Sequence, residues 1–326
     1  MNVLSLFDGM SCGQIALNRL GIKYDKYFAS EIDKGAVMIT QHNFPNTIQL
    51  GNVSKINTSE LPRIDLMFGG SPCQNLSVAG RMKGMTTKDN IKITSLQQYL
   101  DLKSNNFEFE GQSYLFWEYL RILNEVKPKY FLLENVLMQK EWKDIITKEL
   151  GVEPIQINSS LVSAQNRERL YWTNIPDVEQ PVDKNIKLID ILEDIEMIGP
   201  GAIRGRYLNK ATILGRRLNS EGKREDYNKD IPITQCLEVR ATNRDKSNCL
   251  TTVAKDNVLT SMPIGRHQNA FKNKLPFRYF TVKEYCRLQT VPENYFDGIA
   301  SENRIRKMLG NGWTVDVIAH IFKNIK

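Results

Sequence analysis

One cysteine of this chain is placed where a nucleophile would be useful. Cys73 follows the apolar run 64–68, which has the composition of a buried strand, in the turn Gly69-Gly70-Ser71-Pro72-Cys73-Gln74. In open α/β sheets, ligands bind beyond the carboxyl ends of the strands. A lone cysteine is more often a buried structural thiol, but a cysteine behind proline in a glycine-rich turn is less typical of a core. We therefore interpret Cys73 as a nucleophile.

An acid and two arginines follow other apolar runs. Glu134, in Glu134-Asn135-Val136, comes where the run 130–133 ends, and beside Cys73 its carboxyl could act as an acid with a raised pKa. The segment Gln165-Asn166-Arg167-Glu168-Arg169 precedes a further strand, and alternate residues of an extended segment share one face. Arg167 and Arg169 are therefore expected to point the same way. The plainer interpretations are a solvated carboxylate and a surface ladder of ion pairs.

A ligand-binding turn is predicted near the start of the chain. Phe7-Asp8-Gly9-Met10-Ser11-Cys12-Gly13 connects a predicted strand to a predicted helix, and its small residues let the backbone approach a ligand at the helix N-terminus. Glu31 ends the next predicted strand, where a carboxylate can bind ribose hydroxyls. Because the turn is not GxGxxG, binding of a nicotinamide dinucleotide is only weakly supported.

The elements that must position these residues form a mostly parallel α/β sheet, because short apolar runs alternate with amphipathic stretches up to about residue 176. Strands are predicted over 3–7, 26–30, 64–68, 130–133 and 169–175. Helices are predicted over 14–20, 34–42, 114–126, 140–150 and 316–323. Thr281-Val282-Lys283-Glu284 matches a capping box. Shorter β-type pieces between 181 and 276 indicate a second, smaller, mostly β domain.

Residues 74–113 interrupt this order, since they show no sustained period. A structureless loop of that length is usually functional or disordered. It begins right after Pro72-Cys73, so we predict a lid whose residues 85–110 are mobile until the substrate binds.

Composition excludes several classes. The 326 residues are 41% hydrophobic and 25% charged, which fits neither a disordered chain nor a membrane protein. The N-terminus has no basic n-region, which argues against a secretory signal. Five cysteines without a CxxC and three isolated histidines indicate neither a disulfide framework nor a zinc site, so we expect no metal and a reducing cytoplasm.

The positive charge is concentrated in one quarter of the chain. Residues 197–276 hold 15 Lys and Arg against 7 Asp and Glu, whereas the other 246 residues hold 29 basic and 30 acidic side chains. Such an asymmetry is expected of a surface that contacts a phosphate backbone, although a solvated basic surface would look the same. The segment has few aromatic residues, which favours duplex over single-stranded nucleic acid.

The order of the motifs is more specific than any one of them. The motifs follow one another in this order: Phe-Asp-Gly-x3-Gly, Glu31, Gly-Ser-Pro-Cys-Gln, Glu-Asn-Val, Gln-x-Arg-x-Arg, a basic segment, Thr281-x2-Glu284-x2-Arg287-Leu288-Gln289 and Gly310-Asn311-Gly312. Over nearly the whole chain this resembles the DNA (cytosine-5) methyltransferase family. The Asp8 and Ser71-Pro72-Cys73 forms of the motifs resemble the branch that contains the animal de novo enzymes.

The resemblance implies a Rossmann-like, S-adenosylmethionine-dependent methyltransferase fold with a smaller, mostly β target-recognition domain. It places the catalytic and cofactor-binding domain at 1–180 plus 305–326, and the recognition domain and hinge at 181–304. It also implies that the Cys73 thiolate adds to C6 of a cytosine flipped out of duplex DNA. Glu134 would bind N3, Arg167 would bind O2 and help to keep Cys73 ionised, and Arg169 would support the site.

The same resemblance implies S-adenosylmethionine as cofactor, S-adenosylhomocysteine as product, and double-stranded DNA as the partner of a monomeric protein in a bacterial or phage-infected cell. The implied cofactor-binding residues are Phe7, Asp8, Gly9, Gly13, Glu31, Ile32, Asn52, Val53, Pro72, Leu115 and Asn311. The family usually has Asp where this chain has Asn52, whose carbonyl oxygen can still accept from the adenine amino group. The DNA-contacting residues that we expect are Gln74, Ser77, Arg81, Gln165, Arg204, Arg206, Arg216, Arg217, Arg240 and Arg244.

Three other functions would also explain parts of the sequence. A transfer-RNA cytosine methyltransferase shares the same site, but its Cys-Phe-Thr tripeptide does not occur here. A catalytically inactive DNA-binding regulator would not need Cys73, Glu134 and Arg167 together. A nicotinamide-dependent dehydrogenase is the weakest, since the chain lacks the dinucleotide fingerprint.

Overall fold

The structure is a computed structural model that describes residues 1–72, 92–109, 111–193, 209–239, 245–267 and 269–326. Its contacts divide the chain into two compact units. The first unit comprises Met1–Asn158, Glu168–Pro181 and Val315–Lys326, and the second comprises Ser159–Arg167 and Val182–Thr314. The catalytic and recognition roles given to the two parts of the chain, with their boundaries at 181 and 305, stay predictions.

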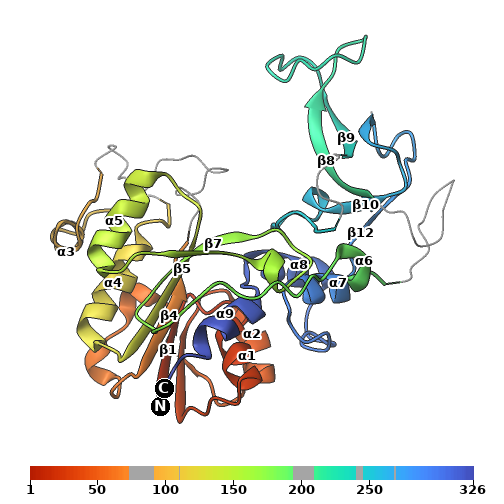
Figure 1. Ribbon diagram of the computed structural model, residues 1–326. Helices are drawn as coiled ribbons and strands as arrows, with labels where there is room; N and C mark the ends of the chain where they lie inside the picture. Colours follow the sequence, from red (N-terminus) through yellow and green to blue (C-terminus); the bar gives the residue numbers. More distant parts are fainter. Residues whose placement is uncertain (73–91, 110, 194–208, 240–244, 268) are drawn as a thin grey trace. The chain divides into compact units, whose positions relative to one another are not determined.

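The first unit contains a seven-stranded sheet in the order β3-β2-β1-β4-β5-β7-β6 (Figure 1). Its strands are β1 (Asn2–Leu6), β2 (Lys26–Ser30), β3 (Ile48–Gln49), β4 (Leu66–Gly70), β5 (Tyr130–Val136), β6 (Ile155–Asn158) and β7 (Glu168–Thr173). The first five pair in parallel, and β7 pairs antiparallel with β5 and β6. The predicted mostly parallel α/β fold is thus confirmed. The strand order reverses between β1 and β4, and a ligand is expected at such a switch point.

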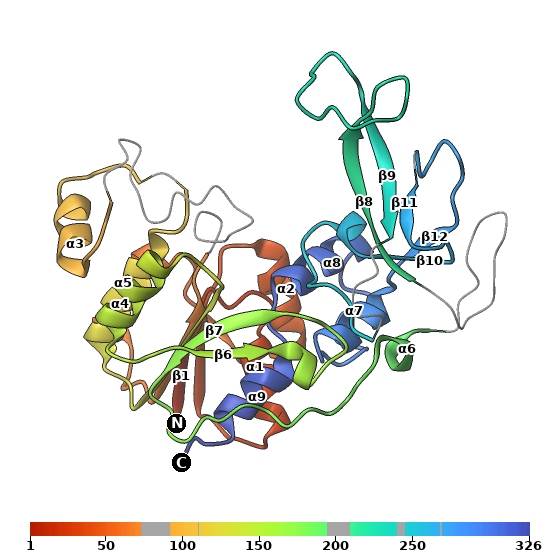
Figure 2. The same ribbon diagram turned by 45° about the horizontal axis from the view of Figure 1, so that its top comes forward.

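Helices cover both faces of this sheet (Figures 1 and 2). They are α1 (Cys12–Arg19), α2 (Lys34–Asn43), α3 (Leu96–Ser104), α4 (Leu115–Val126), α5 (Lys140–Leu150) and α9 (Val315–Phe322), with 3-10 turns η1 (Val53–Lys55) and η2 (Thr58–Glu60). Leu4 and Leu6 of β1 pack in the core beside α4 and α5. On the other face, Phe68 of β4 contacts Phe322 of α9, with ring centroids 5.2 Å apart. Both faces are apolar because both are covered.

The segment after Cys73 differs from the prediction where the structure describes it. The expected lack of structure is wrong for residues 96–104, which form α3. Ser95 caps this helix, Tyr99 is 1% exposed, and both Tyr99 and Lys103 bond to the fully buried Glu118 of α4. The contacts that stabilise α3 come from α4, so a period search within the segment does not reveal them. The mobility predicted for 85–110 is not tested, and residues 85–91 and 110 lie outside the described residues.

The second unit is built on a five-stranded antiparallel sheet in the order β11-β9-β8-β10-β12. Its elements are β8 (Asn209–Arg217), β9 (Ile233–Val239), β10 (Val258–Thr260), β11 (Gly265–His267), β12 (Phe277–Tyr279), α6 (Leu188–Ile191), α7 (Val282–Leu288), α8 (Glu302–Asn311), η3 (Ser159–Leu161) and η4 (Ala254–Asp256). A small apolar cluster that includes Leu237 and Val258 forms its core. The separate antiparallel sheet confirms a second, mostly β part. The capping box is also confirmed, since Thr281 and Glu284 bond reciprocally at the start of α7.

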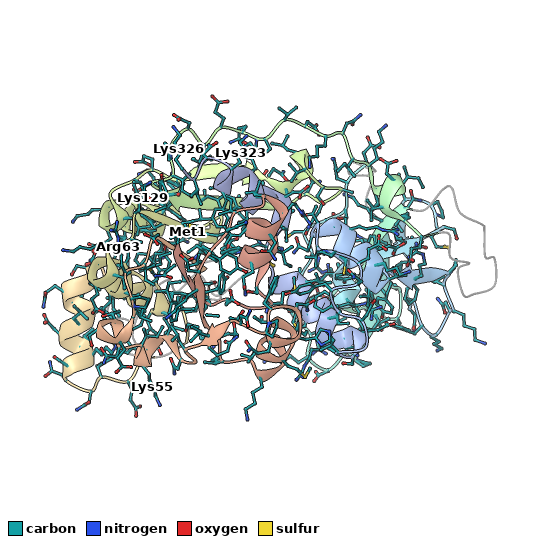
Figure 3. The ribbon with its side chains drawn as sticks, turned by 90° about the horizontal axis from the view of Figure 1, so that it is seen from below. Met1, Lys55, Arg63, Lys129, Lys323 and Lys326 are labelled. Carbon is teal, nitrogen blue, oxygen red and sulfur yellow. The ribbon has the colours of Figure 1, made fainter. Side chains whose placement is uncertain are left out.

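The amino ends of the parallel strands carry positive charge. A positively charged group lies shortly before three of these strands: Met1 before β1, Arg63 before β4 and Lys129 before β5. Figure 3 looks onto this side of the first unit. The motif residues follow the strands instead, so they lie at the opposite edge of the sheet. None of the helices in the described ranges is long and apolar enough to cross a membrane.

Candidate active site

The loop between β1 and α1 has an unusual backbone. Phe7, Gly9 and Ser11 all have left-handed conformations, with φ of 57°, 58° and 64°. This conformation costs little for glycine but is unfavourable for phenylalanine and serine. Space remains beside Gly9, where an added Cβ would meet nothing within 4 Å, whereas a Cβ on Gly13 would lie 2.3 Å from the Phe68 ring. Gly9 therefore leaves room for a ligand, and Gly13 lets α1 pack on the sheet.

The side chain of Asp8, a residue of this loop, is hydrogen-bonded to β2. Its Oδ1 accepts a hydrogen bond from the hydroxyl of Tyr27 on β2 at 2.8 Å, while Oδ2 is buried and has no hydrogen-bond partner among the described residues. Burial raises the pKa of the Asp8 carboxyl to about 6, against the opposing effect of hydrogen bonds from Ser5, Tyr27 and Ser11. The prediction that Asp8 belongs to the cofactor loop did not include Tyr27. In sequence, Tyr27 is indistinguishable from an ordinary core residue of its strand.

Glu31 holds the loop from the end of β2. Its Oε2 accepts from the Gly9 amide at 2.8 Å, and its Oε1 accepts from the amides of Ile32 and Asp33 at 2.7 Å each. These bonds fix the carboxylate in one orientation, and carboxylate oxygens have lone pairs for further donors. Ile32 beside it is 67% exposed. An oriented carboxylate next to an exposed apolar side chain fits a ribose and the flat ring attached to it.

Asn52 and Val53 follow β3. The Asn52 side-chain oxygen accepts from the Ser54 amide at 2.9 Å and caps η1, and Val53 is buried in the core. The Ser30 hydroxyl donates to the carbonyl oxygen of Gly51 at 2.7 Å, which ties this turn to the end of β2. The Asn52 oxygen is thus already an acceptor within the chain, although an amide oxygen has a second lone pair.

The acid and one of the two arginines meet at the ends of β5 and β7. The Arg169 Nε lies 3.0 Å from the Glu134 Oε1, and Glu134 is 8% exposed. Next to Glu134, Asn135 donates to the hydroxyl and the carbonyl oxygen of Ser71 at 3.0 and 3.3 Å. The second and third motifs are therefore joined where β4 and β5 end, two residues before Cys73. The sequence did not indicate this role for Asn135 and Ser71.

Arg167 lies elsewhere than its spacing from Arg169 suggests. Strand β7 begins at Glu168, and Arg167 belongs to the second unit. Its guanidinium is buried and donates to the carbonyl oxygens of Leu250, Gly310 and Gly312 at 3.1, 3.3 and 2.9 Å, with the Cys249 sulfur 3.3 Å away. These bonds connect the segment at Leu250 to the C-terminal end of α8 within the second unit. We therefore do not assign the binding of cytosine O2 to Arg167.

We expect Arg167→Met to destabilise the second unit by roughly 3 kcal/mol, because several buried carbonyl oxygens lose a charged donor while the volume is nearly retained. Urea unfolding followed by circular dichroism measures this change. Arg304→Met is the matched control, since Arg304 is exposed on α8 of the same unit. Equal stability of the two variants would show that the bonds of Arg167 contribute little.

The other predicted residues are distributed as follows. Leu115 begins α4 and Pro72 follows β4, both in the first unit, whereas Asn311 ends α8 in the second. Gln165 is fully buried, and its amide bonds to Leu288, Gln289 and Leu250, so we leave it out of the proposed DNA-contacting set. Arg216 lies 3.5 Å from Asp226, and Arg217 donates to the Lys229 carbonyl oxygen at 3.2 Å. Outside the described residues lie Cys73, Gln74, Ser77, Arg81, Arg204, Arg206, Arg240 and Arg244.

A sheet in the order β3-β2-β1-β4-β5-β7-β6, with β7 antiparallel to its neighbours, is the fold of the S-adenosylmethionine-dependent methyltransferases. The sequence model of the C-5 cytosine-specific DNA methylase family matches residues 1–326, and the chain belongs to this family. The predicted family and fold are thereby confirmed.

Individual relatives agree with this assignment. The orphan methyltransferase M.SPRI of Bacillus phage SPR is 35% identical over 188 residues, which cover 54% of this chain and 38% of that protein. M.SPBetaI of Bacillus phage SPbeta is 31% identical over 198 residues, covering 54% and 45%. The matched regions span less than half of the length of these curated relatives.

Two solved structures show the same fold. The S. pombe Dnmt2 methyltransferase has a TM-score of 0.59 at 18% identity, with 99% of this chain and 97% of that chain covered. The Entamoeba histolytica methyltransferase EhMeth has a TM-score of 0.62 at 15% identity, with 100% and 99% covered.

Proposed function

We propose that this chain transfers a methyl group from S-adenosylmethionine to C5 of a cytosine flipped out of duplex DNA, through a covalent adduct with Cys73. The observation that carries the proposal is the paired Glu134 and Arg169 at the strand ends, joined through Asn135 to Ser71, two residues before Cys73. It is supported by the family to which the chain belongs. A base inside a duplex is out of reach of a side chain, so flipping is required.

The described residues fit the methyl donor. The loop beside Gly9 is open, the Glu31 carboxylate is oriented by three amides, and Ile32 offers an exposed apolar surface. We infer that Glu31 holds the ribose, the exposed Ile32 flanks the adenine, and Asn52 lies at its amino group. When bound, this cofactor supplies the methyl group. The remaining chemistry is assigned to side chains of the protein.

The proposed reaction begins at Cys73. Its thiolate adds to C6 of the cytosine, and the electron pair of the C5–C6 double bond becomes available at C5. Glu134 donates a hydrogen bond or its proton to N3, where negative charge develops. C5 then takes the methyl group, loses its proton to a base, and the returning electron pair expels the thiolate. Cys73 is thus regenerated.

Of the two arginines, we assign the contact with cytosine O2 to Arg169. It is already beside Glu134, and a guanidinium has five N–H donors, so one ion pair leaves others for a base. We assign Arg167 a role in holding the second unit together, for the contacts given above. This revises the roles that the family resemblance implied for the two residues.

Bisulfite sequencing tests the proposed function directly. Duplex DNA of mixed sequence is incubated with the protein and S-adenosylmethionine, and a parallel reaction contains transfer RNA. We expect 5-methylcytosine in the DNA, confined to one sequence context, and none in the RNA. Methylation of the RNA alone would overturn the substrate, and methylation of neither would overturn the proposed activity.

A further inference from the structure

The Asp8 carboxyl has one satisfied and one unsatisfied oxygen in a buried place. Oδ1 accepts from Tyr27, whose side chain is 1% exposed, and the buried Oδ2 has no hydrogen-bond partner among the described residues. The Asp8 backbone is meanwhile anchored, since its amide donates to the Ser30 carbonyl oxygen at 3.0 Å. The carboxyl is therefore held in place rather than free to turn toward water. An unpaired buried carboxylate is unfavourable unless a positive charge comes near it.

The surroundings supply hydroxyl groups but no positive charge. The hydroxyl groups of Ser5 on β1, Tyr27 on β2 and Ser11 before α1 lower the pKa of the carboxyl, and the charge of Glu31 raises it. The Asp8 charge in turn raises the pKa of Tyr24. The Ser11 hydroxyl also accepts a hydrogen bond from the side-chain amide of Gln14, at 2.8 Å. None of these described neighbours of Asp8 carries a positive charge. The result is a carboxyl whose pKa is raised to about 6.

We infer that Asp8 senses the charge of the ligand in the loop above it, so that its ionised form favours the sulfonium-bearing methyl donor over the demethylated product. The inference rests on the proposed function, because it requires that this loop bind S-adenosylmethionine. The donor carries a positive sulfur, which becomes a neutral thioether once the methyl group has left. The two ligands are otherwise the same, including the amino acid and adenosine groups that Glu31 and its neighbours would hold.

The effect acts through the electric field and needs no direct bond. A cation brought near a buried carboxylate stabilises the ionised form, and a tenfold preference for that form lowers its pKa by about one unit. By linkage, donor binding at pH near 5.5 then releases about half a proton from Asp8, and donor affinity rises as the pH increases through about 6. Affinity for the neutral product lacks this component. At pH 7.5 the loop is therefore expected to discriminate against product about fivefold more than at pH 5, where part of the effect is already present.

Isothermal titration calorimetry tests the inference with three proteins and two ligands. S-adenosylmethionine and S-adenosylhomocysteine are titrated at pH 5, 5.5, 6.5 and 7.5, in two buffers of different ionisation enthalpy, so that proton release is measured with affinity. The proteins are the wild-type chain, Asp8→Asn and Tyr27→Phe. Asp8→Asn keeps the shape and removes the titration. Tyr27→Phe removes the hydroxyl that stabilises the ionised form, so it is expected to shift the pH dependence upward.

The expected result is an affinity ratio of donor to product that increases about fivefold from pH 5 to pH 7.5 in the wild-type chain and stays constant in Asp8→Asn. The amino group common to both ligands cancels in this ratio. An equal ratio at all pH values in the wild-type chain would overturn the inference, even if Asp8→Asn does not fold. So would an unchanged pH dependence in Asp8→Asn. If neither ligand binds the wild-type chain at any pH, the proposed function fails and the inference fails with it.

Discussion

Replacing Cys73 with alanine is expected to abolish methyl transfer, lowering the rate by at least ~10³-fold. The substitution removes the thiol whose covalent addition to C6 makes C5 of cytosine electron-rich in the proposed reaction. Binding of duplex DNA and of the methyl donor should be retained, since both depend on other contacts. Single-turnover transfer of a radiolabelled methyl group measures the loss.

Two controls make this result specific. Cys249→Ala removes a thiol of the second unit that we do not place in the reaction, so its methylation rate should stay close to that of the wild-type chain. DNA binding of Cys73→Ala, measured by fluorescence anisotropy, shows whether the site still assembles. Methylation by Cys73→Ala above a thousandth of the wild-type rate would contradict the covalent mechanism.

Replacing Glu134 with glutamine is expected to lower the single-turnover rate by ~10²- to 10³-fold. Glutamine keeps the size of the side chain and an oxygen that can accept from Arg169, but it has no acidic proton to give to N3. Because the Arg169 Nε lies 3.0 Å from the Glu134 Oε1, the substitution also removes the charge that pairs with Arg169, and this is expected to be a second, smaller effect on the rate. The rate is measured with saturating DNA and methyl donor, so that changes in binding do not enter.

Glu141→Gln is the matched control for Glu134→Gln, because Glu141 is an exposed glutamate on α5 of the same unit. Its rate should remain unchanged. Arg169→Lys adds a further test, since it keeps the charge beside Glu134 and removes the fork of donors. If Glu134→Gln proceeds at the wild-type rate, stabilisation of N3 must come from another group.

Elements built from local patterns were predicted well. Strand β2 and helix α5 have the predicted bounds, and the capping box of α7 is confirmed, because each depends on neighbouring residues. Helix α3 was missed because its stability depends on Glu118, which lies on another helix. Local periodicity carries no information about a buried partner so distant in sequence.

The candidate site was predictable in its residue types but not in its partners. Alternation placed Arg167 and Arg169 on one face, yet the regular strand begins between them, at Glu168, and each arginine has its own set of acceptors. Asp8 was recognisable from the sequence as part of a loop. The Asp8 carboxyl accepts a hydrogen bond from Tyr27 of another strand, and nothing in the sequence of the loop specifies that contact.

The packing of α9 on α1 and Phe68 determines when the first unit can be completed during synthesis. This helix follows the second unit in the sequence, and its Val315, Ile318 and Phe322 are fully buried. The ribosome must therefore produce all of residues 182–314 before the apolar face over β1 and β4 is covered. Exposed apolar surface on a nascent chain favours aggregation and chaperone binding. Synthesis of the second unit thus sets how long the first unit needs protection.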